Sequence, residues 1–158
     1  LLGRRQRQMC IRDSSVMELQ ASYITKPSHP YFDVSRDAGA VSSTNVIVYN
    51  SVYTNNGSHY DSSNGRFTAP IAGYYFFYCK INAYNRMDYQ LRVNGRTTNV
   101  DREYGQFATD SSSVGWWSNI VQRHFYLDKN EYVQVYISNI AQNSDPGAWN
   151  TFGGWLVA

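Results

Sequence analysis

Turn-forming clusters interrupt this chain so often that a long helix has no room to form. From Tyr23 onward, short runs of β-branched and aromatic residues alternate with clusters of Gly, Asn, Ser and Asp, which favour turns. No stretch of ten or more residues carries apolar positions at helical spacing together with a cap. The candidate strands are Tyr31–Val34, Asn45–Asn50, Arg66–Ala69, Tyr74–Ala83, Asp88–Val93, Val121–Leu127, Glu131–Ser138 and Thr151–Val157. The pattern predicts one all-β domain, an antiparallel sandwich or jelly roll.

The dipeptide Asn94-Gly95 lies between two of these runs. Both residue types tolerate positive φ, so the pair predicts a tight hairpin.

The run from Gly73 to Ile81 has no polar face over three successive outward positions. Alternation places four side chains on one face, Tyr75, Phe77, Cys79 and Ile81. It places Tyr74, Phe76 and Tyr78 on the other, with Lys80 at its end. An antiparallel sheet usually buries one face and exposes the other to water. Without helices to cover the second face, we predict an oligomer whose interface includes these aromatic residues; a cover formed by a long loop of the same chain is the alternative.

The basic residues are concentrated at the start of the chain. The whole chain has a net charge of +2, of which residues 1–13 contribute +3, so the remainder carries −1. Nucleic-acid affinity depends largely on neutralising phosphates, and the near-neutral remainder therefore argues against a nucleic-acid partner. No window approaches eighteen consecutive apolar residues, which predicts no membrane insertion.

The basic run itself has two interpretations. It has the composition of a nuclear address or a nucleic-acid arm. The segment from Arg4 to Ser14 also looks like translated sequencing adapter, a contaminant of environmental (metagenomic) assemblies, and we expect residues 1–14 to be such an artefact. We expect residues 15–29 to be a leader or linker, residues 30–158 to be the globular domain, and a targeting region to be missing from view.

Aromatic and glycine residues recur at a specific spacing from Tyr49 onward. Tyr49 is followed by Asn55, Tyr60, Phe67, Gly73, Tyr75 and Phe77. Phe32, Leu91–Gly95, the Leu127…Tyr132–Val135 segment and a final F-x-G-x-L of Phe152, Gly154 and Leu156 continue the pattern. In these positions the chain resembles the complement C1q globular-head family over about residues 31–158. It departs from the family pattern at Tyr49, at Cys79 and at Asn130-Glu131; the first two are interpreted as volume adjustments in a core.

The resemblance implies a fold and a mode of action. Members of this family fold as jelly rolls related to tumour necrosis factor and assemble as trimers around an aromatic core. On this basis we expect a homotrimer whose interface contains Tyr74, Phe76, Tyr78, Phe32 and Trp155. The resemblance further implies an extracellular, non-catalytic recognition or adhesion head that binds protein or carbohydrate surfaces through avidity.

Catalytic motifs are absent from the sequence. The three histidines, His29, His59 and His124, are scattered and lie in no hydrolase motif. Cys79 is the one cysteine beyond the leader and falls on the inferred core face, as a small apolar residue would. We therefore expect no enzyme and no catalytic residue.

No cofactor is indicated. Some relatives bind calcium through acidic loop residues near the trimer axis, and Asp88, Asp101 or Glu103 could supply oxygens. None of the three matches a calcium motif, and solvated loop acids are the simpler interpretation.

Ligand-binding candidates are few. Trp116 and Trp117 could form a stacking platform for a sugar or an anchor for a protein, or could pack structurally at the start of the next strand. Arg96, Asp101 and Glu103 of the Asn94–Val114 stretch are further candidates. The rival hypothesis is a purely structural trimerisation cap or the tip of a virion fibre, and the sequence leaves an animal or a viral setting open.

Overall fold

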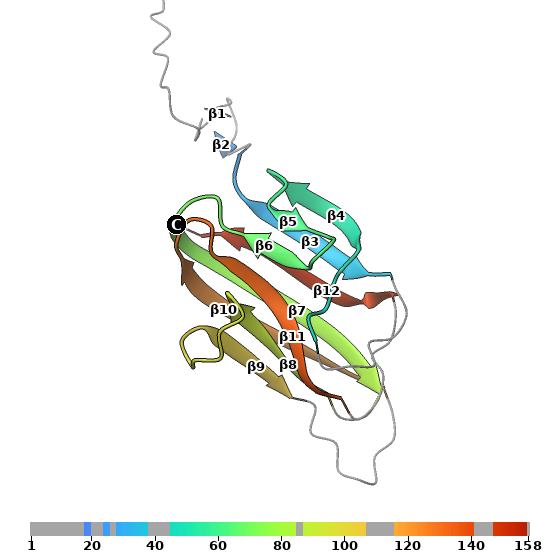
Figure 1. The fold of residues 1–158 in the computed structure, drawn as a ribbon. Coiled ribbons are helices and arrows are strands. Elements are labelled where there is room, and N and C mark those ends of the chain that lie inside the picture. The colour runs from blue at the N-terminus through green and yellow to red at the C-terminus, as the bar shows by residue number, and fades with distance from the viewer. Residues whose placement is uncertain are drawn as a thin grey trace, which may run out of the picture.

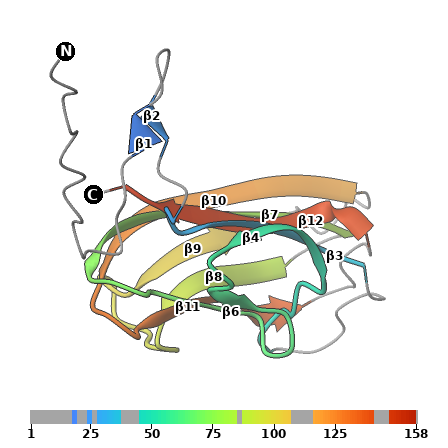
Figure 2. The same ribbon diagram turned by 90° about the horizontal axis from the view of Figure 1, so that it is seen from above.

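A computed structural model describes residues 18–19, 24–25, 28–37, 45–84, 87–106, 116–140 and 147–157. Within these ranges the chain forms strands and no helix, so the prediction of an all-β fold is confirmed. Figure 2 shows the two layers of the resulting sandwich edge-on. No helix in the described ranges is long and apolar enough to span a membrane.

The first layer, called the β7 sheet, has five strands in the order β10-β7-β12-β3-β4 (Figure 1). Its strands are β10 (Trp116–Leu127), β7 (Gly73–Tyr84), β12 (Gly147–Leu156), β3 (Tyr31–Arg36) and β4 (Ser51–Asn56). Every neighbouring pair is antiparallel, and the long β7–β10 ladder joins Gly73 to Leu127 at one end and Tyr84 to Trp116 at the other.

The second layer, called the β11 sheet, has five strands in the order β5-β6-β11-β8-β9. Its strands are β5 (Tyr60–Asp61), β6 (Arg66–Thr68), β11 (Tyr132–Ile140), β8 (Met87–Val93) and β9 (Arg102–Gln106). These pairs are also antiparallel. A separate pair, β1 (Glu18–Leu19) with β2 (Ile24–Thr25), precedes the sandwich in sequence.

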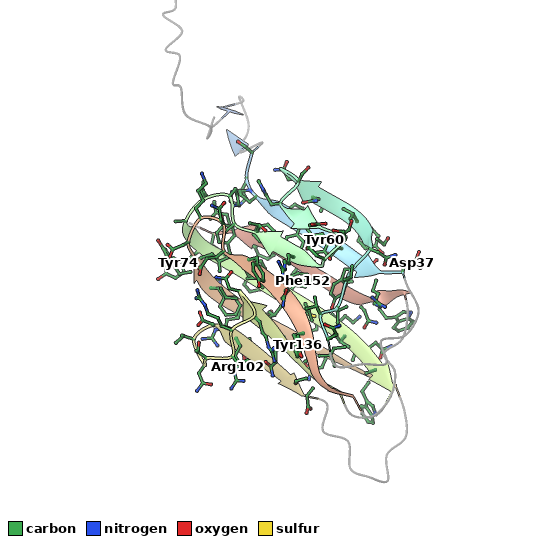
Figure 3. All side chains as sticks on the ribbon, in the orientation of Figure 1. Asp37, Tyr60, Tyr74, Arg102, Tyr136 and Phe152 are labelled. Atoms are coloured by element: carbon green, nitrogen blue, oxygen red, sulfur yellow. The ribbon has the colours of Figure 1, made fainter. Side chains whose placement is uncertain are left out.

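Aromatic rings fill the space between the two sheets. Phe32 stacks on Phe67 at a centroid distance of 4.8 Å and meets Phe152 edge-on at 4.9 Å. Figure 3 places Tyr60 and Phe152 in the middle of the molecule. The structure buries seven aromatic residues of the spaced pattern, Phe32, Tyr49, Tyr60, Phe67, Tyr75, Phe77 and Phe152. Truncating one such ring to alanine typically costs about 3–5 kcal/mol, so this cluster dominates the stability of the fold.

Asn55 holds the turn between β4 and β5. Its side-chain amide donates to the carbonyl of Tyr60 at 2.8 Å, and its amide oxygen accepts from the Tyr60 N–H at 3.0 Å. The side chain thus replaces a pair of backbone partners and fixes where Tyr60 enters the core. This explains why an asparagine at this spacing belongs with the aromatic pattern.

Two of the three departures from the family pattern, Tyr49 and Cys79, touch each other. The hydroxyl of Tyr49 lies 3.2 Å from Cys79 Sγ, and both side chains are fully buried. The Tyr49 hydroxyl therefore occupies space beside the small side chain of Cys79. The interpretation of both residues as volume adjustments agrees with this contact.

The predicted strand Asn45–Asn50 is wrong. The segment forms one isolated bridge, Val46 with Tyr136, and then crosses toward the other layer. Ile47 donates its N–H to Val135 and remains buried, as does Tyr49. Its alternating apolar residues reflect burial during a switch between sheets rather than one continuous ladder.

Besides the two-residue strands β1, β2 and β5, the longer strands β4 and β9 have no counterpart among the predicted strands. Asn55 and Asn56 looked like turn residues, and β9 is too polar to show an apolar alternation. Both are edge strands with a single ladder partner, so their pairing is decided by their neighbours.

The Asn94-Gly95 turn forms, but the hairpin is longer than predicted. Both residues have positive φ, 49° and 69°, and the Arg96 N–H closes the turn on the Val93 carbonyl at 2.8 Å. Residues 96–101 then intervene before β9, which pairs with β8. The turn chemistry was predicted correctly and the length of the connection was not.

Gly154 provides the first test of the packing. A Cβ at this position would lie 2.6 Å from both the Phe76 carbonyl oxygen and the Phe77 ring. Gly154→Ala should lower the free energy of unfolding by about 2 kcal/mol, because a methyl group added to a well-packed core forces neighbouring atoms to shift. Urea denaturation measures this loss.

Gly95→Asn is the matched control. A Cβ at Gly95 would lie 3.7 Å from the nearest heavy atom, the Tyr132 hydroxyl oxygen. Asparagine also tolerates the φ of +69° at this position. A loss for Gly154→Ala no larger than the loss for this control would contradict the close approach of β12 to β7.

Candidate functional site

The outer surface of the β7 sheet carries a cluster of rings, exposed except for the half-buried Phe76 and called here the aromatic face: Tyr74, Phe76, His124, Tyr126 and Trp155. They come from β7, β10 and β12, whose register sets Tyr74 opposite Tyr126 and sets Phe76 between His124 and Trp155. Phe76 lies 4.6 Å from Trp155 and 5.0 Å from His124, measured between ring centroids. Tyr74 meets Tyr126 edge-on at 5.2 Å.

The aromatic face is largely exposed. Tyr74 is 56% exposed, Tyr126 55% and Trp155 37%. No loop among the described residues covers these rings. Burial of the outward rings under a loop of the same chain, the alternative to an oligomer, is therefore not seen in the described ranges. A contiguous exposed aromatic patch is unusual on a monomer and marks an interaction surface.

Tyr78 continues this surface by lying across a glycine. A Cβ on Gly153 would fall within 2.7 Å of three Tyr78 atoms, so the ring occupies the space that a side chain on β12 would need. From there the hydroxyl donates to Asp33 Oδ1 at 2.8 Å. Burial and the Asp33 carboxylate raise the pKa of Tyr78, which keeps the hydroxyl protonated as the donor.

Beyond Tyr78 the outer surface of the β7 sheet becomes polar. Lys80 and Asn82 follow on β7, with Ser118 opposite Asn82 on β10. The Asn82 N–H donates to Asn150 Oδ1 at 2.6 Å, and Ser118 Oγ donates to Asn82 Oδ1 at 3.4 Å. The surface therefore has an aromatic half, beside the residues where the chain enters β3 and leaves β12, and a second half in which these polar residues accompany the exposed Ile120, which pairs with Lys80.

Phe32 is a correction to the predicted interface. It has no solvent exposure and packs on Tyr60 and Phe67 between the sheets. The alternation of β3 points Phe32 and Val34 inward and leaves Tyr31 outward. The prediction of Phe32 as an interface residue is therefore wrong, and the β3 residue exposed on the outer surface is Tyr31, which pairs with Trp155.

The adjacent tryptophans lie in a strand rather than a loop. Both belong to β10, where Trp117 pairs with Ala83 and is 47% exposed. The side chain of Trp116 lies outside the described residues. Trp149 of β12 is also exposed.

The polar ligand candidates form ion pairs within the chain. Arg96 lies 3.6 Å from Asp101 and 3.2 Å from Glu131, and Glu103 lies 2.9 Å from Arg123. Ion pairs this exposed contribute about 0–1 kcal/mol each, so they shape the loop more than they stabilise the fold.

The three acidic candidates are not grouped within the described chain. Asp101 and Glu103 each face an arginine, and Asp88 lies buried elsewhere on β8. Among the described residues no group of three or more His, Cys, Asp or Glu side chains lies close enough to hold a metal ion.

Cys79 and the histidines form no reactive arrangement in the described part of the chain. Burial raises the pKa of the Cys79 thiol to about 12, a shift that the hydrogen bond with Tyr49 partly opposes. A protonated buried thiol is a poor nucleophile. His59 packs on Phe67 and His124 on Phe76.

Two five-stranded antiparallel sheets in this order, with an exposed aromatic face on one of them, define a jelly-roll module. A family model of the C1q domain matches residues 31–157, and the chain belongs to the C1q domain family. This family is known for trimeric ligand-binding heads.

Individual relatives agree with this assignment. Human "Complement C1q tumor necrosis factor-related protein 3" is 29% identical over 116 residues, which are 70% of this chain and 44% of that protein. The chain thus spans less than half the length of the curated relatives it matches. These relatives give the virion-fibre alternative no support.

Solved structures share the fold. The globular domain of zebrafish complement 1qA protein superposes with a TM-score of 0.65 and 16% identity, over 82% of this chain and 98% of that one. Murine APRIL superposes with a TM-score of 0.63 and 12% identity, over 82% and 99%. At such identities the likeness establishes the fold alone, and it confirms the predicted jelly-roll type.

The buried hydroxyls and thiol predict a loss of stability in alkali. Burial raises the pKa of Tyr49, Tyr60, Tyr89 and Cys79, so these groups stay protonated in the folded state while they ionise in the unfolded state. The unfolded state then binds fewer protons, and the free energy of unfolding should fall once the pH exceeds about 9. Each group contributes a slope of up to about 1.4 kcal/mol per pH unit.

Urea denaturation of the protein and of Cys79→Ala between pH 7 and pH 11 measures this slope. The variant should start less stable and lose stability less steeply between pH 9 and pH 11, because one ionising group is gone. Parallel curves for the two proteins would show that the thiol does not contribute.

Proposed function

We propose that this chain is a non-catalytic recognition head that acts outside the cell as a homotrimer and binds protein or glycan surfaces. The observation that carries the proposal is the aromatic face, which the described residues of the same chain leave open. Membership of a family of trimeric ligand-binding heads supports the same stoichiometry.

In this proposal the aromatic half of the β7 sheet meets its copies around a three-fold axis. Tyr74, Phe76, Tyr78 and Trp155 supply the contacts predicted from the sequence, and Tyr31 and Tyr126 extend them. Removing exposed apolar area from water stabilises the assembly by about 25 cal/mol per Å². The Tyr hydroxyl and Trp indole N–H groups can still form hydrogen bonds at the edge of the interface. The β11 sheet then faces outward on all three protomers.

The mechanism of recognition is avidity. Three identical outward surfaces engage one repetitive target, so that weak single contacts add without any strong pocket. No reaction step is needed, since the described residues bring together no nucleophile with a base. A purely structural trimerisation cap would share the assembly and lack the ligand.

Light scattering of the chain of residues 1–158 across a dilution series tests the assembly. We expect three times the mass of one chain, and we expect Tyr74→Asp to reduce it to one chain, because a buried carboxylate without a partner is costly. Circular dichroism of the variant should remain that of a folded β protein.

Val100→Asp is the matched control, since Val100 is an exposed apolar residue in the β8–β9 loop, away from the aromatic face. It should leave the trimer intact. A folded wild-type monomer at all concentrations would remove the avidity mechanism.

A further inference from the structure

Four consecutive strands of the β11 sheet place one polar residue each in a single row. The register pairs Arg66 of β6 with Gln134 of β11, Gln134 with Arg92 of β8, and Arg92 with Arg102 of β9. At a strand spacing of about 4.8 Å, the row, called here the arginine row, spans about 14 Å between its end Cα atoms.

The arginine row lies on the outer surface of the sheet. Val133, Val135 and Ile137 of β11 are fully buried, so the alternate positions, including Gln134, point away from the core. On β9, Glu103 turns inward to Arg123 of the other sheet, which leaves Arg102 on the outward side. Figure 3 labels Tyr136 and Arg102 on this sheet.

Two of the three guanidinium groups lie over tyrosine rings. Arg66 Cζ lies 4.2 Å from the Tyr132 ring centroid and Arg92 Cζ lies 3.7 Å from that of Tyr136. The Nε of Arg66 donates to Gln134 at 3.3 Å, and the Nε of Arg92 donates to Gln90 at 2.8 Å. A guanidinium fixed in this way loses little entropy when its outer N–H groups bind an oxyanion.

Like charges stand directly opposite each other at Arg92 and Arg102, an arrangement that costs energy in a sheet. The nearest acid along the row is Asp61, opposite Arg66 on β5. Its carboxylate accepts hydrogen bonds from Ser63 and Asn64 of its own turn, and these bonds together with the charge of Arg66 lower the pKa of Asp61, so Asp61 offsets part of the charge at that end of the row. Asp88 lies farther along β8 and is 4% exposed. An anionic ligand laid along the row would relieve the repulsion.

We propose that the arginine row binds a sulfated polysaccharide chain. Cations in a line across an open sheet surface match a linear polymer with repeated oxyanions better than a single compact anion. Single-stranded nucleic acid is less favoured, because it needs open aromatic faces for its bases and both tyrosines already carry a guanidinium. This proposal names the ligand class of the proposed recognition head. It rests on the proposed trimer only for the gain in affinity from three sites per molecule.

Binding to immobilised heparin and to a short heparin oligosaccharide in solution tests the row. All proteins comprise residues 1–158 and carry Arg4→Gln, Arg5→Gln, Arg7→Gln and Arg12→Gln, so that the basic start of the chain does not bind. The double variant Arg66→Gln/Arg102→Gln should weaken binding of the oligosaccharide at least about tenfold. It should also lower the slope of log affinity against log salt by about two.

Lys129→Gln is the matched control, because Lys129 is an exposed cation in the turn between β10 and β11. It should change the affinity less than about twofold, and fully desulfated heparin should not bind. Equal binding by the double variant and the control would overturn the proposal. Binding that is as tight to desulfated heparin, or to a thymidine oligonucleotide of equal charge, would overturn the assignment to sulfated glycans.

Assembly is measured separately on the same samples. A trimer that does not bind heparin would refute the arginine row and leave the proposed assembly standing. A monomer whose heparin binding is weakened by the double variant would support the arginine row as the binding site and refute the avidity mechanism. Tyr74→Asp should keep the affinity for the short oligosaccharide and lose the slow dissociation from the dense heparin surface.

Discussion

Strand β7 is the constraint on which both halves of this molecule depend. It pairs along its whole length with β10 and, from Tyr75 to Lys80, with β12 on its other edge. Its inward residues, from Tyr75 to Ala83, have no solvent exposure, while Tyr74, Phe76 and Tyr78 point outward. The inward row closes the core against the β11 sheet. The described residues of the same chain cover the outward row only in part and leave Tyr74 56% exposed, and this is why the fold leads to a proposal of assembly rather than of a pocket.

Two glycines of β12 allow close contact with neighbouring residues of β7, because they carry no side chain. Gly154 lies against the Phe77 ring and the Phe76 carbonyl, so β12 can press on β7 from the core side. Gly153 does the same on the outer side, where it lets Tyr78 lie flat and reach Asp33 of β3. The contact of Tyr49 with Cys79 follows the same logic, because a hydroxyl on one side chain is matched by a small thiol on the other. Adjacent residues of one strand thus serve the core and the surface independently.

The two outer surfaces of the sandwich have different chemistry. The β7 sheet presents rings that gain by excluding water, whereas the β11 sheet presents guanidinium groups that remain hydrated or bind anions. A trimer closed by the first surface would leave the second outward on every protomer. The proposed function and the proposed glycan site therefore use opposite faces, and a substitution on one face can be expected to spare the other.

The sequence by itself determined the elements that follow from local pattern. Alternation identified β7 and its two apolar faces, the turn clusters excluded helices, and the spacing from Tyr49 to Phe77 indicated the family and most of the core. The tertiary structure decided what depends on pairing between distant segments. It made residues 45–50 a crossing between sheets, buried Phe32 in the core, and paired the polar strands β4 and β9. It also aligned Arg66, Arg92 and Arg102, which are far apart in sequence, because strand register is set by neighbouring strands and by burial rather than by the local chain.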